Sequence, residues 1–135
     1  MKNRKVTLST LWIFAMLNYM YADILTTIDS LAHPAAFREG YVAGVHVTQG
    51  ALLGAAVLIE TAIAMTLLAR LLKYRANRWA NIIAGAIHTV AVLLSLFLGG
   101  TPTLFYAFFG TIEVVCTSVI IWYAWTWRDL GAATA

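Results

Sequence analysis

Two glutamates lie inside the most apolar stretches of this sequence, and they are the residues best placed to do chemistry there. Glu60 lies within "VLIETAIAM" (57–65), and Glu113 lies within "GTIEVVCTS" (110–118). A charged side chain at the centre of a bilayer costs about 2.5–3.5 kcal/mol on insertion scales. Such residues persist where they face other protein groups, and acids held in this way can bind a ligand or transfer a proton. Glu60 and Glu113 are therefore the first candidates for a functional site.

Other polar residues are expected near these glutamates when the apolar segments are aligned by depth, at about 1.5 Å rise per residue. One central residue comes from each of the other two segments, and a second layer lies nearer the outer face. Tyrosines share helix faces with these groups at spacings of three, four or seven residues. The candidates for ligand binding or proton relay are Glu60, Glu113, Asp23, His88, His46, Asn18, Gln49, Tyr19 and Tyr106.

A structural role for the same residues stays open. Polar side chains in small membrane bundles also set the helix register through hydrogen bonds between helices, each worth about 0.6–2 kcal/mol. That interpretation suits single Asn, Gln or Thr residues best. Two central glutamates and a histidine in a chain of 135 residues favour a functional site.

The elements that must position these residues are membrane-spanning helices. The chain is 61% hydrophobic and 11% charged, whereas a soluble domain carries about 25% charged residues. A span needs about 20 apolar residues. Four windows qualify, at about residues 8–28, 41–72, 79–98 and 103–127, with Pro102 just before the last. Whether the outer end of the second segment is helical or bends at Gly44 or Gly50 is left open.

The connections between the four segments are short, so consecutive helices are expected to be antiparallel neighbours. The sequence therefore predicts an all-α membrane protein, in which residues 1–135 form a single domain. Its architecture is a four-transmembrane-helix antiparallel bundle.

The positive charges predict the orientation of this bundle. Eight of the nine Lys and Arg residues fall before the first segment, between the second and third, or after the fourth. Arg38 is the exception. By the positive-inside rule both termini are then cytoplasmic. The five tryptophans lie toward the same face, where indole rings anchor at the headgroups.

Several functional classes are disfavoured by composition. The net charge of +3 comes from residues at helix ends, so no nucleic-acid partner is expected. The single cysteine, Cys116, excludes an internal disulfide and a multi-cysteine metal site. The Glu-x-x-His pair typical of carboxylate-bridged metal bundles does not occur, and we expect no metal. The cofactor, if the protein uses one, is unknown.

Several segments resemble a known family. They are "LSTLWIFAMLNYMYADIL" (8–25), "TQGALLGAA" (48–56), "KYRANRWANIIAG" (73–85) and "IIWYAW" (120–125). Together they resemble a family of small bacterial four-helix integral membrane proteins of unknown function. The second and third segments are also similar to DoxX-like membrane proteins, some of which are linked to quinone-related redox chemistry. The resemblance implies the four-helix topology and the bacterial inner (cytoplasmic) membrane. It assigns no catalytic residue.

We expect an integral membrane protein whose intramembrane polar cluster binds a small lipophilic molecule, because apolar walls with a few polar groups suit such a ligand. One alternative is a proton-coupled small-molecule transporter that acts as a dimer. Another is a membrane interaction or scaffold protein with a structural polar core. The lipid bilayer is the expected partner. Whether the protein is an enzyme or a homo-oligomer is left open.

Overall fold

The computed structural model describes residues 3–98 and 100–128. Four helices in this part are long and apolar enough to cross a membrane, by length and composition. They are α1 (Arg4–Ala32), α3 (Gln49–Leu71), α4 (Tyr74–Leu98) and α5 (Leu104–Trp125). The shorter elements are α2 (Pro34–Arg38) and the strands β1 (Tyr41–Val42) and β2 (Val45–His46).

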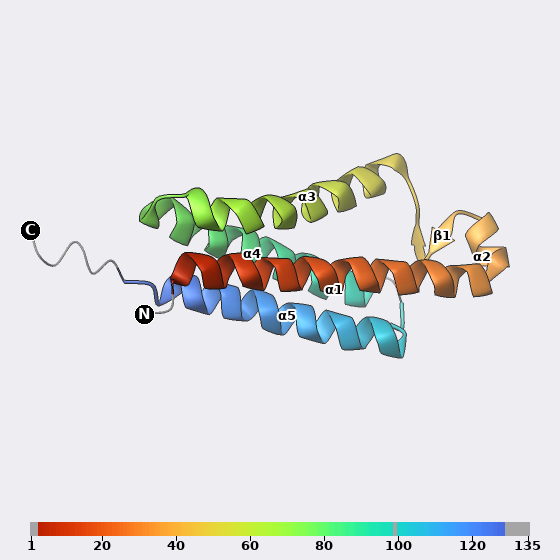
Figure 1. The fold of residues 1–135 in the computed structure, drawn as a ribbon. Helices are drawn as coiled ribbons and strands as arrows, with labels where there is room; N and C mark the ends of the chain where they lie inside the picture. The colour runs from red at the N-terminus through yellow and green to blue at the C-terminus, as the bar shows by residue number, and fades with distance from the viewer. Residues whose placement is uncertain (1–2, 99, 129–135) are drawn as a thin grey trace, which may run out of the picture.

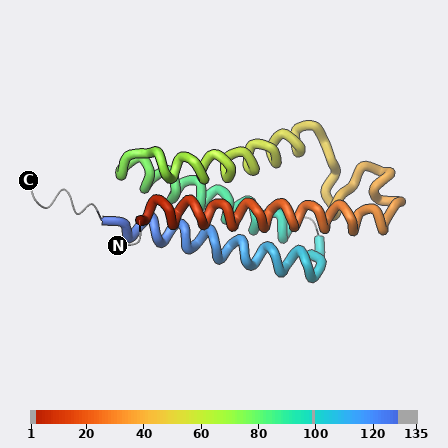
Figure 2. Tube along the Cα trace, in the orientation of Figure 1, coloured from red at the N-terminus to blue at the C-terminus, as the bar shows by residue number. Residues whose placement is uncertain are grey.

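The four long helices lie side by side along their lengths (Figure 1). α1 begins and α5 ends at the same end of the bundle, which we call the termini end. The short connection between α3 and α4 is also at this end. α2 and β1 lie at the opposite end, which we call the hairpin end, and the chain path is easily followed in the tube view (Figure 2).

The second long helix is shorter than its apolar segment. The sequence predicted a helix from about residue 41, but α3 begins at Gln49, and residues 41–46 form a small antiparallel hairpin instead. Ala43 and Gly44 adopt positive φ angles of 50° and 76°, which a right-handed helix cannot accommodate. Thr48 then caps α3, because its hydroxyl accepts a hydrogen bond from the Ala51 amide at 3.1 Å.

The other helices differ from the expected bounds mainly in length. α1 is longer at both ends than 8–28, and its first turn is capped by Asn3, whose side chain accepts from the Lys5 amide. α4 begins at Tyr74 rather than at residue 79. Polar residues at these ends continue the helices past the apolar spans, because helix length is not limited to the hydrocarbon thickness.

The core is concentrated toward the termini end. Its fully buried members include Leu8 and Trp12 of α1, Ala69 of α3 and Ile120 of α5. All buried residues of α3 lie between Ala62 and Ala69, in its second half. The first half of α3 is mostly exposed, so the helices pack less closely toward the hairpin end.

α4 and α5 approach each other closely. A Cβ atom added at Gly85 would lie 2.8 Å from Ile121 Cγ1, so only glycine fits there. One turn further along α4, the hydroxyls of Thr89 and Thr117 are hydrogen-bonded at 2.7 Å. Small and polar residues at such contacts are typical of helices that pack in lipid.

Candidate ligand-binding site

A cavity lies between the long helices, in the half of the bundle nearer the hairpin end. Its volume is about 200 Å³, and we call it the inner cavity. Tyr19 and Asp23 of α1, His88 of α4 and Glu113 of α5 line it, with apolar side chains between them. Tyr106 of α5 lines it as well, so the structure brings five of the residues expected from the sequence to one cavity.

Three of these residues bury polar atoms that have no hydrogen-bond partner among the described residues. The atoms are Tyr19 Oη, His88 Nε2 and Glu113 Oε1. His88 is only 3% exposed and Glu113 only 5%. A buried polar group left without a partner costs about 1–3 kcal/mol, so native proteins rarely keep several together. All three residues line the inner cavity.

The histidine is held firmly by aromatic neighbours. The Tyr19 ring stacks on the His88 ring, with centroids 5.3 Å apart and planes inclined by 20°. The Trp12 ring meets the same imidazole edge-on at 5.3 Å. His88 Nε2 is thus fixed in place before any ligand binds, which lowers the entropic cost of binding.

A buried hydrogen-bond network closes the termini side of the cavity. Trp12 Nε1 donates to Asn81 Oδ1 at 2.8 Å, and Asn81 Nδ2 donates to Asn77 Oδ1 at 2.7 Å. Asn77 Nδ2 donates to the Ala69 carbonyl at 2.6 Å, which links the network to α3. Trp12, Asn77 and Asn81 are fully buried. This network forms a packed floor beneath the His88 ring.

The sequence contains little sign of this floor. Asn81 is not among the residues expected at the site, and neither is Asn77. Its four-residue spacing from Asn81 places both on one helix face, which is the signal that was available. Trp12 was interpreted as a headgroup anchor, whereas it is fully buried in the core.

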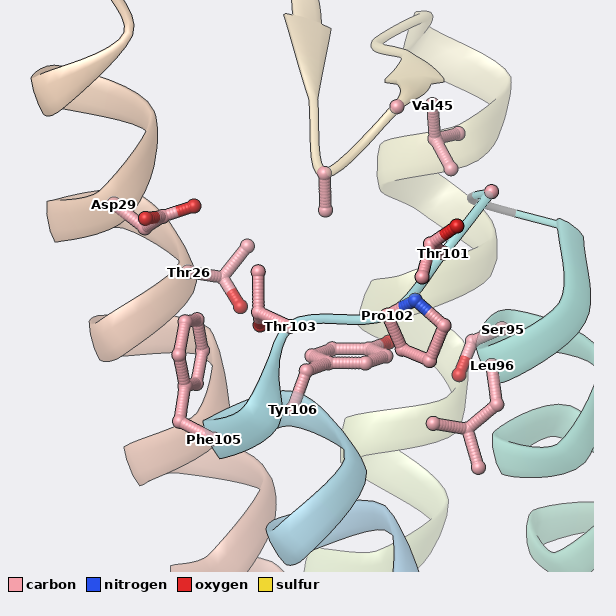
Figure 3. Close-up of a pocket in the computed structure, with 13 residues that line it drawn as sticks. Thr26, Asp29, Val45, Ser95, Leu96, Thr101, Pro102, Thr103, Phe105 and Tyr106 are labelled. Carbon is pink, nitrogen blue, oxygen red and sulfur yellow. The ribbon is translucent and has the colours of Figure 1, made fainter.

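A second cavity of about 230 Å³ lies between the inner cavity and the hairpin (Figure 3), and we call it the outer cavity. Asp29 and Thr26 of α1 lie on one side of it, and Ser95 of α4 lies on the other. The Tyr106 ring extends from α5 toward the α4 side. Ser95 and Tyr106 line both cavities, so the two adjoin at these residues.

Glu60 does not reach the cluster. It was expected near the bundle centre with Glu113, but it is exposed on α3. Two residues along a helix turn about 200°, so Glu60 points away from the face on which Ala62 is buried.

Three further candidates lie outside the inner cavity. His46 is exposed on β2, where its ring packs against Tyr41 at 5.1 Å, because residues 41–46 form the hairpin. Gln49 is exposed at the start of α3. Asn18 is half-buried, and its amide donates to the Phe14 carbonyl of its own helix at 2.8 Å. The Asn18 side chain therefore bonds to the backbone of α1 and does not line the inner cavity.

Metal ligation is not favoured by the side-chain arrangement. Within residues 3–98 and 100–128, no group of three or more His, Cys, Asp or Glu side chains could hold a metal ion. Cys116 is buried, and its thiol lies 3.4 Å from the Leu11 carbonyl between α1 and α5.

The fold and the site define a class of small helical protein, with four helices able to cross a membrane and a polar cavity between them. A model described as "Family of unknown function (DUF6326)" matches residues 1–134, and the chain belongs to this family. No curated protein and no solved structure matches the chain. The likeness of the second and third segments to DoxX-like proteins therefore stays a prediction.

Proposed function

We propose that this chain is an integral membrane protein that binds a small lipophilic molecule in the inner cavity. The observation that carries the proposal is that Tyr19, His88 and Glu113 line one cavity, and each buries a polar atom that has no partner among the described residues. A ligand that hydrogen-bonds to these atoms would relieve the cost of burying them. The apolar residues between them would hold the rest of the ligand.

The proposal includes a placement in the membrane. The chain would form an antiparallel bundle in the cytoplasmic membrane of a bacterium, with both termini on the cytoplasmic side. The Lys and Arg distribution supports this orientation. The hairpin end, the outer cavity and Arg38 would then lie at the outer face.

The volume of the cavity limits the ligand. An engineered cavity of about 150 Å³ binds benzene, and drug-sized ligands occupy about 300–1,000 Å³. The inner cavity, at about 200 Å³, thus suits one ring with a short substituent. A longer molecule would extend toward the outer cavity past Tyr106.

Binding is better supported than the two alternatives. A transporter needs access from both sides, whereas the floor of Trp12, Asn77 and Asn81 is fully buried. A purely structural polar core would satisfy its own hydrogen bonds, whereas Glu113 Oε1 and His88 Nε2 have no partner within residues 3–98 and 100–128. Both observations favour a site that is reached from the hairpin end.

Filling the cavity tests the proposal. Ala91 of α4 lines the inner cavity, so Ala91→Leu should place extra carbon atoms where the ligand would lie. We expect benzyl alcohol to bind the wild-type protein in nanodiscs and to bind this variant about tenfold more weakly or worse, a loss of at least about 1.4 kcal/mol. Saturation-transfer NMR against empty nanodiscs would measure the binding.

Ala86→Leu is the matched control, because Ala86 is on the same helix but is exposed and does not line the cavity. Its benzyl alcohol affinity should equal that of the wild-type protein. Equal affinities for both variants, or no binding above empty nanodiscs for the wild-type protein, would contradict the proposed site.

A further inference from the structure

We infer that the ligand of the inner cavity is a lipophilic amine, which binds with its protonated nitrogen near Asp23 and Glu113. This inference rests on the proposed function and names the chemical class of the ligand. Both carboxyl groups line the same cavity, Glu113 at its buried part and Asp23 at its exposed rim. Among the described residues that line the inner cavity, none is Lys or Arg.

A positively charged group on the ligand would complement the carboxyl groups of this lining. Buried charges in proteins are paired, because an isolated charge in an apolar environment is very costly. Glu113 is 5% exposed, and its Oε1 atom has no partner among the described residues. An ammonium group would supply the counter-charge and donate a hydrogen bond to the Glu113 carboxyl group. A neutral ligand could supply only the hydrogen bond.

The walls suit the rest of such a molecule. Tyr19 and Tyr106 present aromatic rings to the cavity, and a cation over an aromatic face gains about 0.5–2 kcal/mol. Leu58, Ile59 and Val92 form an apolar surface beside them. This combination matches an amine attached to a ring rather than a bare metal ion, which would leave the apolar surface unused.

The approach to the site carries the same sign of charge. Asp29 lines the outer cavity and also a third space of about 470 Å³ beside the hairpin, which Glu39 lines as well. The three cavities adjoin through shared lining residues, so carboxyl groups occur at each stage from the hairpin end inward. Clefts lined by one sign of charge raise the local concentration of opposite charges.

The decisive comparison is between benzylamine and benzyl alcohol, which share the ring and differ in the charged group. We expect benzylamine to bind the wild-type protein in nanodiscs at least about tenfold more tightly than benzyl alcohol. Glu113→Gln should abolish this preference, because the amide keeps the shape and removes the charge. Asp23→Asn should reduce the preference for benzylamine, and this variant replaces Glu113→Gln as the test if Glu113→Gln does not fold. Glu60→Gln, which neutralises a carboxyl outside the cavity, should leave the preference unchanged.

The outcomes separate this inference from the proposed function. If benzyl alcohol binds as tightly as benzylamine, or if both cavity variants keep the preference for benzylamine, the amine inference is overturned while the site remains. If neither compound binds the protein in nanodiscs more strongly than it binds empty nanodiscs, the proposed function is contradicted as well.

A second inference comes from the opposite face of α3. A stripe of residues at alternating spacings of four and three follows this face, and it points away from the buried residues Ala62 and Met65. We call it the α3 stripe. Its members are Leu53, Val57, Glu60, Ala64, Leu67 and Leu71.

The α3 stripe resembles a helix interface without its partner. Leu53 and Leu71 are 66% and 67% exposed, and the spacing is that of a coiled-coil seam. Glu60 lies near the middle of this stripe, where it makes no hydrogen bond or ion pair with any described residue. Ionisable residues inside membranes almost always face protein or water, so lipid is a poor neighbour for this face.

We propose that the α3 stripe is covered by a second copy of this chain. The Lys and Arg distribution gives both copies the same orientation, so a two-fold axis along the membrane normal would bring each residue opposite its own copy. Glu60 would then meet the other Glu60 at the same depth. One carboxyl group can donate its O–H to an oxygen of the other, so the pair needs no third group.

Cysteine cross-linking tests the dimer. In a Cys116→Ala background, Val57→Cys should form an intermolecular disulfide when membranes are oxidised with copper phenanthroline. Val115→Cys on α5 is the matched control, because Val57 and Val115 are 58% and 57% exposed. We expect a dimer with the first variant only. A monomer with both variants, equal dimers with both, or cross-linking of Val57→Cys only to another protein would overturn the proposal.

The role of Glu60 has its own test. Glu60→Gln keeps a side chain that donates and accepts, and Glu60→Ala removes it. We expect the first variant to dimerise like the wild-type protein in liposomes and the second to dimerise about threefold to tenfold more weakly, measured by single-molecule photobleaching. Unchanged or stronger dimerisation of Glu60→Ala would overturn the pairing of the two carboxyl groups.

Discussion

At the scale of single residues, the site is organised around the imidazole of His88. Tyr19 and Trp12 hold this ring from two sides, and the indole of Trp12 is in turn held by Asn81. His88 Nε2 is buried and has no hydrogen-bond partner in the part of the chain that the structure describes. A well-satisfied floor beneath an unsatisfied cavity is the pattern expected of a pre-formed binding site.

Removal of the Asn81 side chain should destabilise the folded protein. Asn81→Ala leaves Trp12 Nε1–H and Asn77 Oδ1 buried without their partner. We expect the free energy of unfolding to fall by about 1–3 kcal/mol, measured by titration with SDS in mixed micelles. Asn18→Ala is the control, because Asn18 bonds only within its own helix. Equal losses in the free energy of unfolding for the two variants would contradict a stabilising role for the network of Trp12, Asn77 and Asn81.

At the scale of helices, α4 and α5 form the closest pair, and α3 is the least enclosed helix. The contact at Gly85 and the hydroxyl pair of Thr89 and Thr117 hold α4 against α5. These contacts fix His88 and Glu113 relative to each other, because the two residues lie on these helices. The exposed first half of α3 lines the inner cavity with Ala55, so this helix can admit a ligand without disturbing the pair.

A methyl group at Gly85 should separate α4 from α5. In Gly85→Ala the new Cβ atom would lie 2.8 Å from Ile121 Cγ1, so the helices must shift. We expect a loss of about 1–3 kcal/mol in the free energy of unfolding in micelles. Gly54→Ala on α3 is the control, since nothing lies within 4 Å of its added atom. The control should be unchanged or slightly more stable, because alanine favours helix. Unchanged stability of Gly85→Ala would contradict the close contact.

At the scale of the whole molecule, the two ends of the bundle differ in character. The termini end carries most of the basic residues and the packed core, with Arg4 donating to the Tyr123 carbonyl at 2.8 Å. The hairpin end carries the cavities and the acidic residues Asp29 and Glu39. In the proposed orientation this asymmetry makes the site reachable from outside and closed toward the cytoplasm.

The orientation can be measured with two exposed alanines. In a Cys116→Ala background, Ala36→Cys in α2 should react with a membrane-impermeant maleimide added to intact spheroplasts. Ala76→Cys near the start of α4 should react only after permeabilisation. Basic residues flank Ala76, and basic residues are retained on the cytoplasmic side. The reverse pattern would place the cavities on the cytoplasmic side and contradict the proposed route of entry.

The sequence by itself determined the class of the molecule. Apolar runs of about 20 residues separated by short polar segments favour long apolar helices, because a helix satisfies its backbone polar groups within the segment. Helix existence therefore followed from composition, as the four long helices show. Glu113, His88, Tyr19 and Asp23 were also recognised from residue type and depth alone.

Only the tertiary structure decided which polar residues meet. Depth along a helix follows from counting residues, but the direction in which a side chain points depends on where the helix starts and how it is rotated against its neighbours. The hairpin at residues 41–46 removed His46 from the helix, and the rotation of α3 turned Glu60 outward. In an almost uniformly apolar helix such as α3, the pattern of hydrophobic residues cannot specify the inward face. Packing of Ala62, Met65 and Ala69 against the other helices specifies it instead.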